Sequence, residues 1–237
     1  AGYDMVDVDT CTEAGILVVN QAGANSESVA QHVLGMMLGL SKQIVQSDRR
    51  MRLDRDDWER WTYKGKELTG RTLGIIGLGN VGRRVSALAG QMFAMRVIAY
   101  DPYITPEDFS EQGAQQVSFD DVFTEADFVS LNCPLTEETK SMVGRREFEL
   151  MKPTAYFITT ARGGIHDEGA LAAVVSEGGI AGAGLDVFAE EPPPLDHPLL
   201  EFDNVIVSPH IAGITDDCTY KMASWAAEPW LTIFPGA

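Results

Sequence analysis

The sequence is poor in positive charge, poor in cysteine and free of long apolar runs. It holds 18 Lys and Arg residues against 35 Asp and Glu residues, which gives a net charge of −17. A nucleic acid or an anionic membrane surface would repel such a chain, so neither is expected as a partner. No run is long and apolar enough to predict a membrane span, and no signal peptide opens the chain. The 45% of apolar residues is instead typical of a globular protein with a real core.

The three cysteines, Cys11, Cys133 and Cys218, are far apart and form no metal-binding or redox motif. We interpret them as reduced thiols, which are typical of a cytoplasmic protein. Histidines are also few, and no two of them stand at ligand spacing. His166 and His197 lie in turns and are predicted on the surface. The sequence therefore predicts no metal site.

The chain lacks an initiator methionine and opens on Ala-Gly-Tyr-Asp at positions 1–4. Two short apolar segments follow, at 6–8 and 16–20, and the second has the composition of a buried strand. Two such elements cannot form a core by themselves. We expect residues 1–25 to be the remnant of a second domain.

A long helix is predicted over residues 26–45, because apolar residues recur there at helical spacing behind a cap at Asn25 or Ser26. Gly35 and Gly39 would share one face of this helix. Either they permit close packing against another domain or subunit, or they are merely tolerated.

Residues 46–70 are charged and irregular, with Trp58 and Trp61 close together. These tryptophans either pack across a subunit boundary or belong to an ordinary core. His32, on the preceding helix, is interpreted as a hydrogen-bonded structural histidine rather than a ligand.

The most informative stretch begins with an apolar run at 73–76 that leads into Gly-x-Gly-x-x-Gly at 77–82. A helix-compatible segment follows at 83–93, and a second apolar run at 97–100 ends in Asp101. The order strand, glycine turn, helix, strand and acid is typical of a dinucleotide-binding unit. The alternative is a glycine turn in some other α/β unit.

Each part of this unit has a physical role. Gly77 allows a tight turn off the strand, Gly79 leaves room for a pyrophosphate, and Gly82 lets the helix pack close to the sheet. The free N–H groups at the start of the helix favour phosphate. A carboxylate at Asp101 can accept hydrogen bonds from ribose hydroxyls and would repel a 2′-phosphate, which favours NAD over NADP.

Beyond Asp101, apolar runs alternate with helix-compatible segments. Strands are predicted at 128–131, 155–159, 180–185 and 205–207, and helices at 118–126, 136–143 and 167–176. A final helix is predicted from about residue 215. Strands that alternate with helices indicate a parallel, doubly wound sheet of the α/β class.

Ligands of such sheets bind beyond the carboxyl ends of the strands. Residues at these ends are scattered in the sequence but are expected to converge in space. They are Gly77, Gly79, Asp101, Cys133, Pro134, Thr160, Arg162, Asp186 and His210.

Some of these residues are suited to catalysis. Arg162, between an apolar run and two glycines, can clamp a carboxylate; the alternative is a surface arginine in a turn. His210 can exchange a proton near neutral pH, with a structural histidine as the alternative. Glu190 and Glu191 precede two prolines, and a carboxylate beside His210 would orient the imidazole and favour its protonated form. By itself the acidic pair is a solvated loop. With NAD, this set suits reduction of a 2-keto acid or oxidation of a 2-hydroxy acid.

Four motifs occur in order along the chain. They are Gly-Ile-Ile-Gly-Leu-Gly-Asn-Val-Gly at 74–82, Thr-Ala-Arg-Gly-Gly at 160–164, Leu-Asp-Val-Phe-Ala-Glu-Glu-Pro-Pro at 185–193 and Ser-Pro-His-Ile-Ala-Gly at 208–213. In these motifs the chain resembles the D-isomer-specific 2-hydroxyacid dehydrogenases, the family of phosphoglycerate dehydrogenase, glyoxylate/hydroxypyruvate reductase and formate dehydrogenase. The resemblance extends over essentially the whole sequence.

The resemblance implies that Arg162 binds the substrate, that His210 is the acid/base and that Glu191 is its carboxylate partner. Asp186 is implied to lie near the nicotinamide carboxamide. The cofactor-contacting positions implied are Gly77, Gly79, Asn80, Val81, Gly82, Asp101, Cys133, Pro134, Thr139, Thr160, Ala161, Arg162, Asp186, His210, Ala212 and Gly213.

The resemblance also implies a Rossmann NAD-binding domain over 26–213, linked through the 26–45 helix to a partial substrate domain. Residues 214–237 would form a helix returning toward that domain. Family members carry a further N-terminal part of the substrate domain. This sequence therefore does not predict which side chain the substrate carries.

The sequence thus predicts an NAD-dependent D-2-hydroxyacid dehydrogenase, a homodimer that acts on a small anionic 2-hydroxy or 2-keto acid. One alternative is an NAD(H)-sensing binding protein of the same fold, like the C-terminal-binding corepressors. Another is a chain that binds NAD without turnover.

Overall fold

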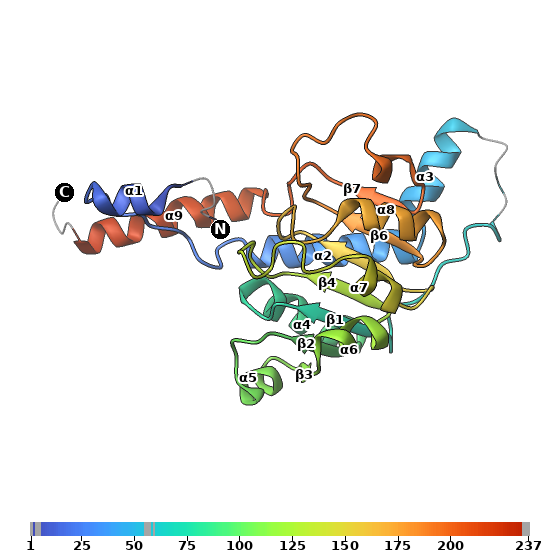
Figure 1. The fold of residues 1–237 in the computed structure, drawn as a ribbon, viewed down its shortest axis with the longest axis horizontal. Coiled ribbons are helices and arrows are strands. Elements are labelled where there is room, and N and C mark those ends of the chain that lie inside the picture. Colours follow the sequence, from blue (N-terminus) through green and yellow to red (C-terminus); the bar gives the residue numbers. More distant parts are fainter. Residues whose placement is uncertain (1, 3–5, 55–57, 59, 234–237) are drawn as a thin grey trace.

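The computed structural model describes residues 2, 6–54, 58 and 60–233 and forms one seven-stranded sheet (Figure 1). The strands are β1 (Thr72–Ile76), β2 (Arg96–Tyr100), β3 (Gln115–Gln116), β4 (Phe128–Leu131), β5 (Tyr156–Thr159), β6 (Gly182–Leu185) and β7 (Val205–Val207). Their order across the sheet is β3-β2-β1-β4-β5-β6-β7, and every neighbouring pair is parallel. The predicted doubly wound parallel sheet is confirmed. The motif at 1–4 falls, apart from Gly2, outside the described residues.

Helices cover both faces of the sheet. On one face lie α2 (Ser26–Ser41) and α4 (Asn80–Phe93), which pack on each other and on the strands. On the other lie α6 (Phe119–Glu125), α7 (Arg145–Leu150) and α8 (Glu168–Ser176). The strands separate two apolar cores, because successive side chains of a strand point to opposite faces. Strands buried on both faces read as continuous apolar runs, which is why the sequence located them.

Five further elements complete the described secondary structure. They are α1 (Val8–Glu13), α3 (Ile44–Leu53), α5 (Pro106–Glu111), the 3-10 helix η1 (Pro198–Glu201) and α9 (Asp216–Ile233). In Figure 1, α1 and α9 extend beyond one end of the sheet, and α3 lies toward the other end. Of the helices in the described ranges, none has the length and apolar character needed to cross a membrane.

The predicted strand at 16–20 is wrong. These residues form no strand, and Ile16 is 59% exposed. An apolar run becomes a strand only when another strand pairs with it, and no described residue offers that pairing.

The predicted helix at 136–143 is also wrong, because side chains there compete with the helical backbone bonds. Thr139 Oγ1 donates to the Pro134 carbonyl at 2.6 Å and accepts from the Thr136 N–H at 2.8 Å. Further along, the Ser141 N–H donates to the carbonyl of Gly164 at 2.8 Å. The segment is therefore a turn anchored to the loop after β5.

The helix predicted over 26–45 is shorter than expected. It ends at Ser41, Gln43 takes a left-handed conformation with φ 54°, and α3 begins at Ile44. The segment 46–70, predicted as irregular, thus starts within a helix. Both Trp58 and Trp61 are exposed, which removes the interpretation that they belong to the core of this chain.

The two glycines of α2 have different surroundings. A Cβ on Gly39 would lie 3.0 Å from the Ile206 side chain, whereas one on Gly35 would meet nothing within 4 Å. Gly39 therefore brings the helix close to β7, and Gly35 leaves an open place on the surface of α2.

His166, predicted on the surface, is only 2% exposed. Its ring packs on Phe157 with centroids 5.5 Å apart, and neither ring nitrogen has a hydrogen-bond partner in the described part of the chain. Burial lowers the pKa of His166 to about 4, although the charges of Glu168 and Asp167 act in the opposite direction. The imidazole is therefore held neutral at physiological pH.

We predict that His166→Leu stabilises the protein, because leucine fills the site without burying two unpaired nitrogen atoms. The pKa of His166 is lower in the folded chain (about 4) than its ordinary 6.5, so the unfolded chain binds the proton more readily. Stability contributed by the neutral ring is therefore lost as pH falls from 6.5 toward 4. Between pH 7 and pH 5 the loss is about 2 kcal/mol. Urea unfolding of both proteins at these two pH values should give a smaller difference for the variant; identical differences would contradict the prediction.

Candidate functional site

The turn that follows β1 is built from glycines with different roles. Gly77 has φ +88°, and a Cβ there would lie 2.7 Å from the backbone nitrogen of Cys133. A Cβ on Gly82 would lie 2.2 Å from the Gly77 carbonyl oxygen, so this glycine lets α4 approach the turn. A Cβ on Gly79 would meet nothing within 4 Å. Two glycines are thus needed for packing, and the third faces open space at the start of α4.

A cavity of about 640 Å³ opens beside this turn, and we name it the β1–β2 cavity. Six of the predicted cofactor positions line it: Gly77, Gly79, Asp101, Cys133, Pro134 and Thr139. The Asp101 carboxylate accepts from the Leu78 N–H at 2.9 Å and from the Tyr103 N–H at 3.0 Å. The carboxylate therefore ties the end of β2 to the glycine turn and stands at the cavity wall.

Other groups complete the β1–β2 cavity. The hydroxyl of Tyr103 donates to the Glu138 carboxylate at its rim. Burial, reinforced by the negative charge of Asp101, raises the pKa of the Cys133 thiol to about 11. Cys133 is thus a neutral thiol in the cavity wall and is not activated as a nucleophile.

A second cavity, of about 380 Å³, lies at the ends of the other strands, and we name it the β5–β7 cavity. It is lined by Thr160 and Arg162 after β5, Asp186 after β6, and His210 after β7. The turn formed by Ala212 and Gly213 and two residues of α9, Thr219 and Met222, also line it. Three strand ends that are far apart in the sequence therefore meet at one place.

His210 is held by contacts to both its backbone and its ring. It has φ 54°, and its N–H donates to the Asp186 carbonyl at 2.8 Å. Its Nδ1 lies 2.8 Å from Glu191 Oε2, while Glu191 Oε1 accepts from the Phe188 N–H at 3.0 Å. Because a carboxylate can only accept, Nδ1 carries the proton, and Nε2 is left to exchange a proton with a ligand.

The Glu191 carboxylate is ionised in this arrangement. Partial burial would raise the pKa of Glu191, but the hydrogen bonds from His210 and the Phe188 N–H outweigh that effect. The positive charge of Arg162 acts in the same direction, and the pKa lies below its ordinary value. A negative charge beside Nδ1 stabilises a positive charge on the imidazole.

Arg162 reaches the β5–β7 cavity from the turn after β5. Its Nη1 donates to the Ala161 carbonyl at 2.6 Å. The next residue, Gly163, packs so tightly that a Cβ there would lie 2.0 Å from the Phe188 carbonyl oxygen. The turn that carries Arg162 is therefore fixed against the loop that carries Glu191.

Asp186 is 1% exposed and accepts hydrogen bonds at both carboxylate oxygens. Oδ1 accepts from Ser208 Oγ at 2.6 Å and from the Ile211 N–H at 2.9 Å. Oδ2 accepts from the Ala212 N–H at 2.8 Å. A carboxylate held by these donors stays oriented at the edge of the cavity.

The residues present fit a dinucleotide laid along the carboxyl edge of the sheet. The space above Gly79 would admit a pyrophosphate, and the carboxylate of Asp101 would receive the adenosine ribose. The Asn132 Oδ1 atom, in the wall of the β1–β2 cavity, is buried and lacks a partner among the described residues. An unsatisfied buried acceptor of this kind is expected to bind a donor from a ligand or water.

Four predicted cofactor positions line neither cavity: Asn80, Val81, Gly82 and Ala161. Conversely, the sequence interpretation missed Asn25, which lines the β5–β7 cavity and lies against Gly213. Asn25 was predicted only as a helix cap, and it does precede α2, but its side chain makes no capping bond. No group of three or more His, Cys, Asp or Glu residues within the described ranges is placed to hold a metal ion.

Comparison with protein families gives a match over residues 34–212 to the NAD-binding domain of the D-isomer specific 2-hydroxyacid dehydrogenases. The D-3-phosphoglycerate dehydrogenase of Archaeoglobus fulgidus is 38% identical over 235 residues, which cover 99% of this chain and 44% of that protein. The glyoxylate reductase of Aeropyrum pernix is 40% identical over 232 residues, which cover 96% of this chain and 69% of that protein. The chain thus spans less than half the length of the phosphoglycerate dehydrogenase.

Among solved structures, the D-lactate dehydrogenase from Aquifex aeolicus, complexed with NAD and lactic acid, is similar to this chain with a TM-score of 0.87. The two sequences are 33% identical, and the match covers 99% of this chain and 74% of the other. The likeness therefore includes the sheet and the helices on its two faces.

Proposed function

The chain belongs to the D-isomer specific 2-hydroxyacid dehydrogenases and holds their NAD-binding domain, and from this premise we propose that the full-length protein transfers a hydride between NAD(H) and a small D-2-hydroxy acid or its 2-keto acid. The observation that supports this most directly is the composition of the β5–β7 cavity. Arg162 and His210 line the same cavity, and Glu191 lies 2.8 Å from His210. A carboxylate binder and a proton donor are what reduction of a 2-keto acid requires of the protein.

Arg162 is proposed to bind the substrate carboxylate. Its planar guanidinium presents several N–H donors at once, so it can fix both the position and the tilt of a carboxylate. The turn that carries it is packed against the loop of Glu191, which keeps the guanidinium close to the imidazole. Binding one end of the substrate here places its carbonyl group near His210.

His210 is proposed to donate the proton to the carbonyl oxygen during reduction, and to remove it from the hydroxyl in the reverse direction. Bound NADH supplies the hydride. Protonated at both nitrogens, His210 donates from Nε2, while Glu191 neutralises part of the charge. After the transfer, the proton on Nδ1 stays on the ring and still donates to Glu191, and Nε2 is left as a base. The same pair thus works in both directions.

The cofactor would be held by the predicted positions along the carboxyl edge of the sheet. The glycine turn and the start of α4 would receive the pyrophosphate, and the β1–β2 cavity would receive the adenosine. Asp186 would accept from the carboxamide N–H group at the other end. These roles support NAD as the cofactor, which is also the cofactor that the family domain binds.

The proposal is tested with the full-length protein, NADH and a panel of glyoxylate, hydroxypyruvate, pyruvate and phosphohydroxypyruvate. We expect NADH absorbance to decrease with at least one of these acids. Tight NADH binding without turnover on any of them would favour the alternative of an NAD(H)-sensing binding protein. Calorimetric titration with NADH, carried out first, shows whether the cofactor site is formed.

We predict that Asp101→Ala relaxes the preference for NAD over NADP. The β1–β2 cavity loses one negative charge that would repel a 2′-phosphate and one acceptor for the ribose hydroxyls. Kd values for NADH and NADPH should move toward each other, with NADH weakened by at least about tenfold, the effect of one lost charge-assisted hydrogen bond. Asp108→Ala, which removes a carboxylate that caps α5 outside the cavity, is the matched control. An unchanged ratio of the two Kd values in Asp101→Ala would reject this role.

We further propose a homodimer. Trp58 and Trp61 are large apolar side chains on the surface, and Gly35 leaves an open place on α2. Such surface features are common where subunits meet. Light scattering on the full-length protein should give twice the mass of one chain, and a mass of one chain would reject the dimer. A cytoplasmic location is also proposed, which the three free cysteines support.

A further inference from the structure

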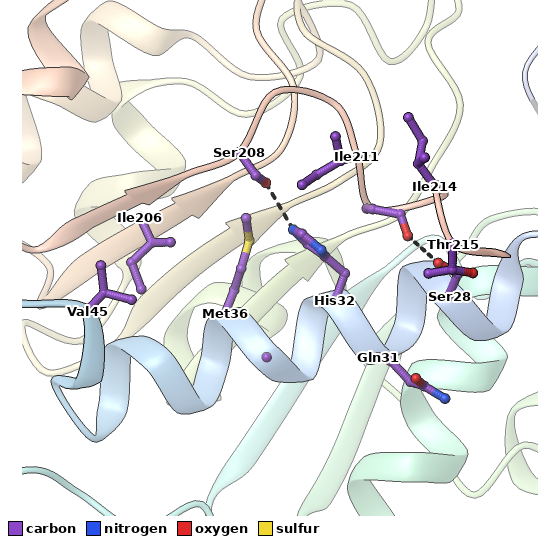
Figure 2. Close-up of a pocket in the computed structure, with 12 residues that line it drawn as sticks. Ser28, Gln31, His32, Met36, Val45, Ile206, Ser208, Ile211, Ile214 and Thr215 are labelled. Carbon is purple, nitrogen blue, oxygen red and sulfur yellow. Dashed lines mark hydrogen bonds between the residues drawn. The ribbon is translucent and has the colours of Figure 1, made fainter. Parts of the chain in front are cut away.

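Asp186 is the inner end of a chain of hydrogen bonds that reaches the surface of the molecule. Its Oδ1 atom accepts from Ser208 Oγ at 2.6 Å, and Ser208 Oγ lies 2.9 Å from Nε2 of His32 on α2 (Figure 2). His32 and Asp186 do not meet directly at hydrogen-bond distance, since Nε2 and Oδ1 are 3.7 Å apart. Ser208 therefore connects them.

The directions of these bonds follow from the number of protons. Asp186 accepts from backbone N–H groups at both oxygens, and Ser208 Oγ donates to its Oδ1. Ser208 has a single hydroxyl proton, which is then used on Asp186. The lone pairs of Ser208 Oγ remain, so His32 Nε2 must be the donor in the second bond. His32 thus fixes the direction in which Ser208 donates.

His32 and Asp186 line different depressions of the surface. His32 is 24% exposed and lines a groove of about 510 Å³ with Met36 and Ile206, as Figure 2 shows. Asp186 lines the β5–β7 cavity. The turn after His210 lies between the two, since Ala212 belongs to both linings and its N–H donates to Asp186.

We propose that His32 is a positioning residue for Asp186, acting through Ser208. Because His32 donates to Ser208, the hydroxyl of Ser208 donates to Asp186 Oδ1. This hydrogen bond fixes the plane of the carboxylate. Oδ2, which accepts from the Ala212 N–H, retains capacity for a second donor. This inference rests on the proposed function, in which that donor is the carboxamide N–H of the nicotinamide.

A merely structural role is the alternative, because the same bonds also join α2 to the segment after β7. The two roles differ in which ligand they affect. A structural defect would weaken every ligand of the carboxyl edge, whereas a displaced Asp186 would weaken only ligands that carry the nicotinamide. ADP-ribose, which has the adenosine, pyrophosphate and second ribose but no nicotinamide, separates the two.

The experiment measures Kd for NADH and for ADP-ribose by calorimetry on the full-length protein. His32→Phe removes the donor at similar size, Ser208→Ala removes the connecting hydroxyl, and the double variant removes both. Each is expected to raise the NADH Kd about fivefold, the effect of one hydrogen bond, and to leave the ADP-ribose Kd unchanged. Because both changes interrupt one chain, the double variant should match the single ones. His32→Gln, which can still donate an N–H, should bind NADH nearly as the unsubstituted protein does.

Gln31→Ala provides the matched control, since Gln31 lines the same groove but bonds to Glu27 at 2.7 Å. It should change neither Kd. Equal weakening of NADH and ADP-ribose, additive effects in the double variant, or unchanged NADH binding would each overturn the positioning role. If His32→Phe does not fold, Ser208→Ala alone decides between these outcomes. An unsubstituted protein that binds neither ligand would instead overturn the proposed function, and with it this inference.

Discussion

Replacing His210 with alanine in the full-length protein is expected to lower kcat by about 10²- to 10⁴-fold, the usual loss when a positioned acid/base is removed. His210 is the residue at the edge of the β5–β7 cavity whose ring is fixed at one nitrogen and available at the other. Nδ1 is held by Glu191 at 2.8 Å, so the proton that moves is the one on Nε2. Without the imidazole, that proton has to come from water.

The backbone of His210 requires a companion variant. With φ 54°, the residue lies in the left-handed region, where alanine is strained much as histidine is but asparagine is better tolerated. His210→Asn should therefore fold at least as well as His210→Ala and lose a similar share of kcat. NADH affinity should fall far less than kcat in both variants, because the other predicted cofactor positions are unchanged. If asparagine restores turnover, backbone strain rather than the lost acid/base explains the alanine result.

Arg162→Lys is expected to lower kcat/KM by about 100-fold, although the positive charge is kept. Lysine offers a point charge on a flexible stem, so it can attract a carboxylate but cannot fix its tilt. At this site the tilt is important, because the guanidinium and the imidazole act on two ends of one small molecule. The loss should therefore appear in kcat as well as in KM.

Arg145→Lys is the matched control for this change. Arg145 lies on the surface, where it pairs with Glu149 and Glu177, and the same replacement there should leave kinetics unaltered. NADH binding should be unaffected in Arg145→Lys and should change far less than kcat/KM in Arg162→Lys. A kcat/KM for Arg162→Lys within threefold of the unsubstituted protein would show that charge alone suffices and would reject the clamp.

The two cavities lie along the carboxyl edge of one sheet and have different proposed roles, one in binding the cofactor and the other in binding the substrate and transferring a proton. The β1–β2 cavity holds Asp101 and the glycine turn, and the β5–β7 cavity holds Arg162 and His210. Strands β1 and β4 are adjacent, as are β4 and β5, so the intervening edge is continuous. A dinucleotide bound along that edge would reach both cavities.

Most of the strands could be predicted from the sequence because their side chains are buried on both faces of the sheet, whereas β3, exposed at both residues, was not predicted. The runs at 73–76 and 128–131 are buried along their whole length, and so are β5 and β6. The same criterion failed at 16–20, where the apolar run lies exposed and unpaired within the described residues. Composition reports what a segment can bury, and the rest of the fold decides whether it is buried.

Side-chain hydrogen bonds and tertiary contacts are the second reason why predictions from the sequence failed. The stretch at 136–143 has helical composition, but Thr139 bonds back to Pro134 and the segment becomes a turn. His166 stands between turn residues and acids, yet the bridge between Val143 and His166 brings it into the core. Both outcomes depend on the partner segments that the chain meets, which periodicity does not reveal.

By itself, the sequence determined the class of sheet, the glycine turn, the acid at the end of β2 and the strand ends that line the two cavities. These are local properties, set by residue type and spacing along a few consecutive residues. Only the tertiary structure decided that Glu191 Oε2 meets His210, that Arg162 is packed against the same loop, and that His32 reaches Asp186 through Ser208. Those contacts join residues from different strands and helices. They exist because parallel strands bring their carboxyl ends to one edge, whatever their distance in the sequence.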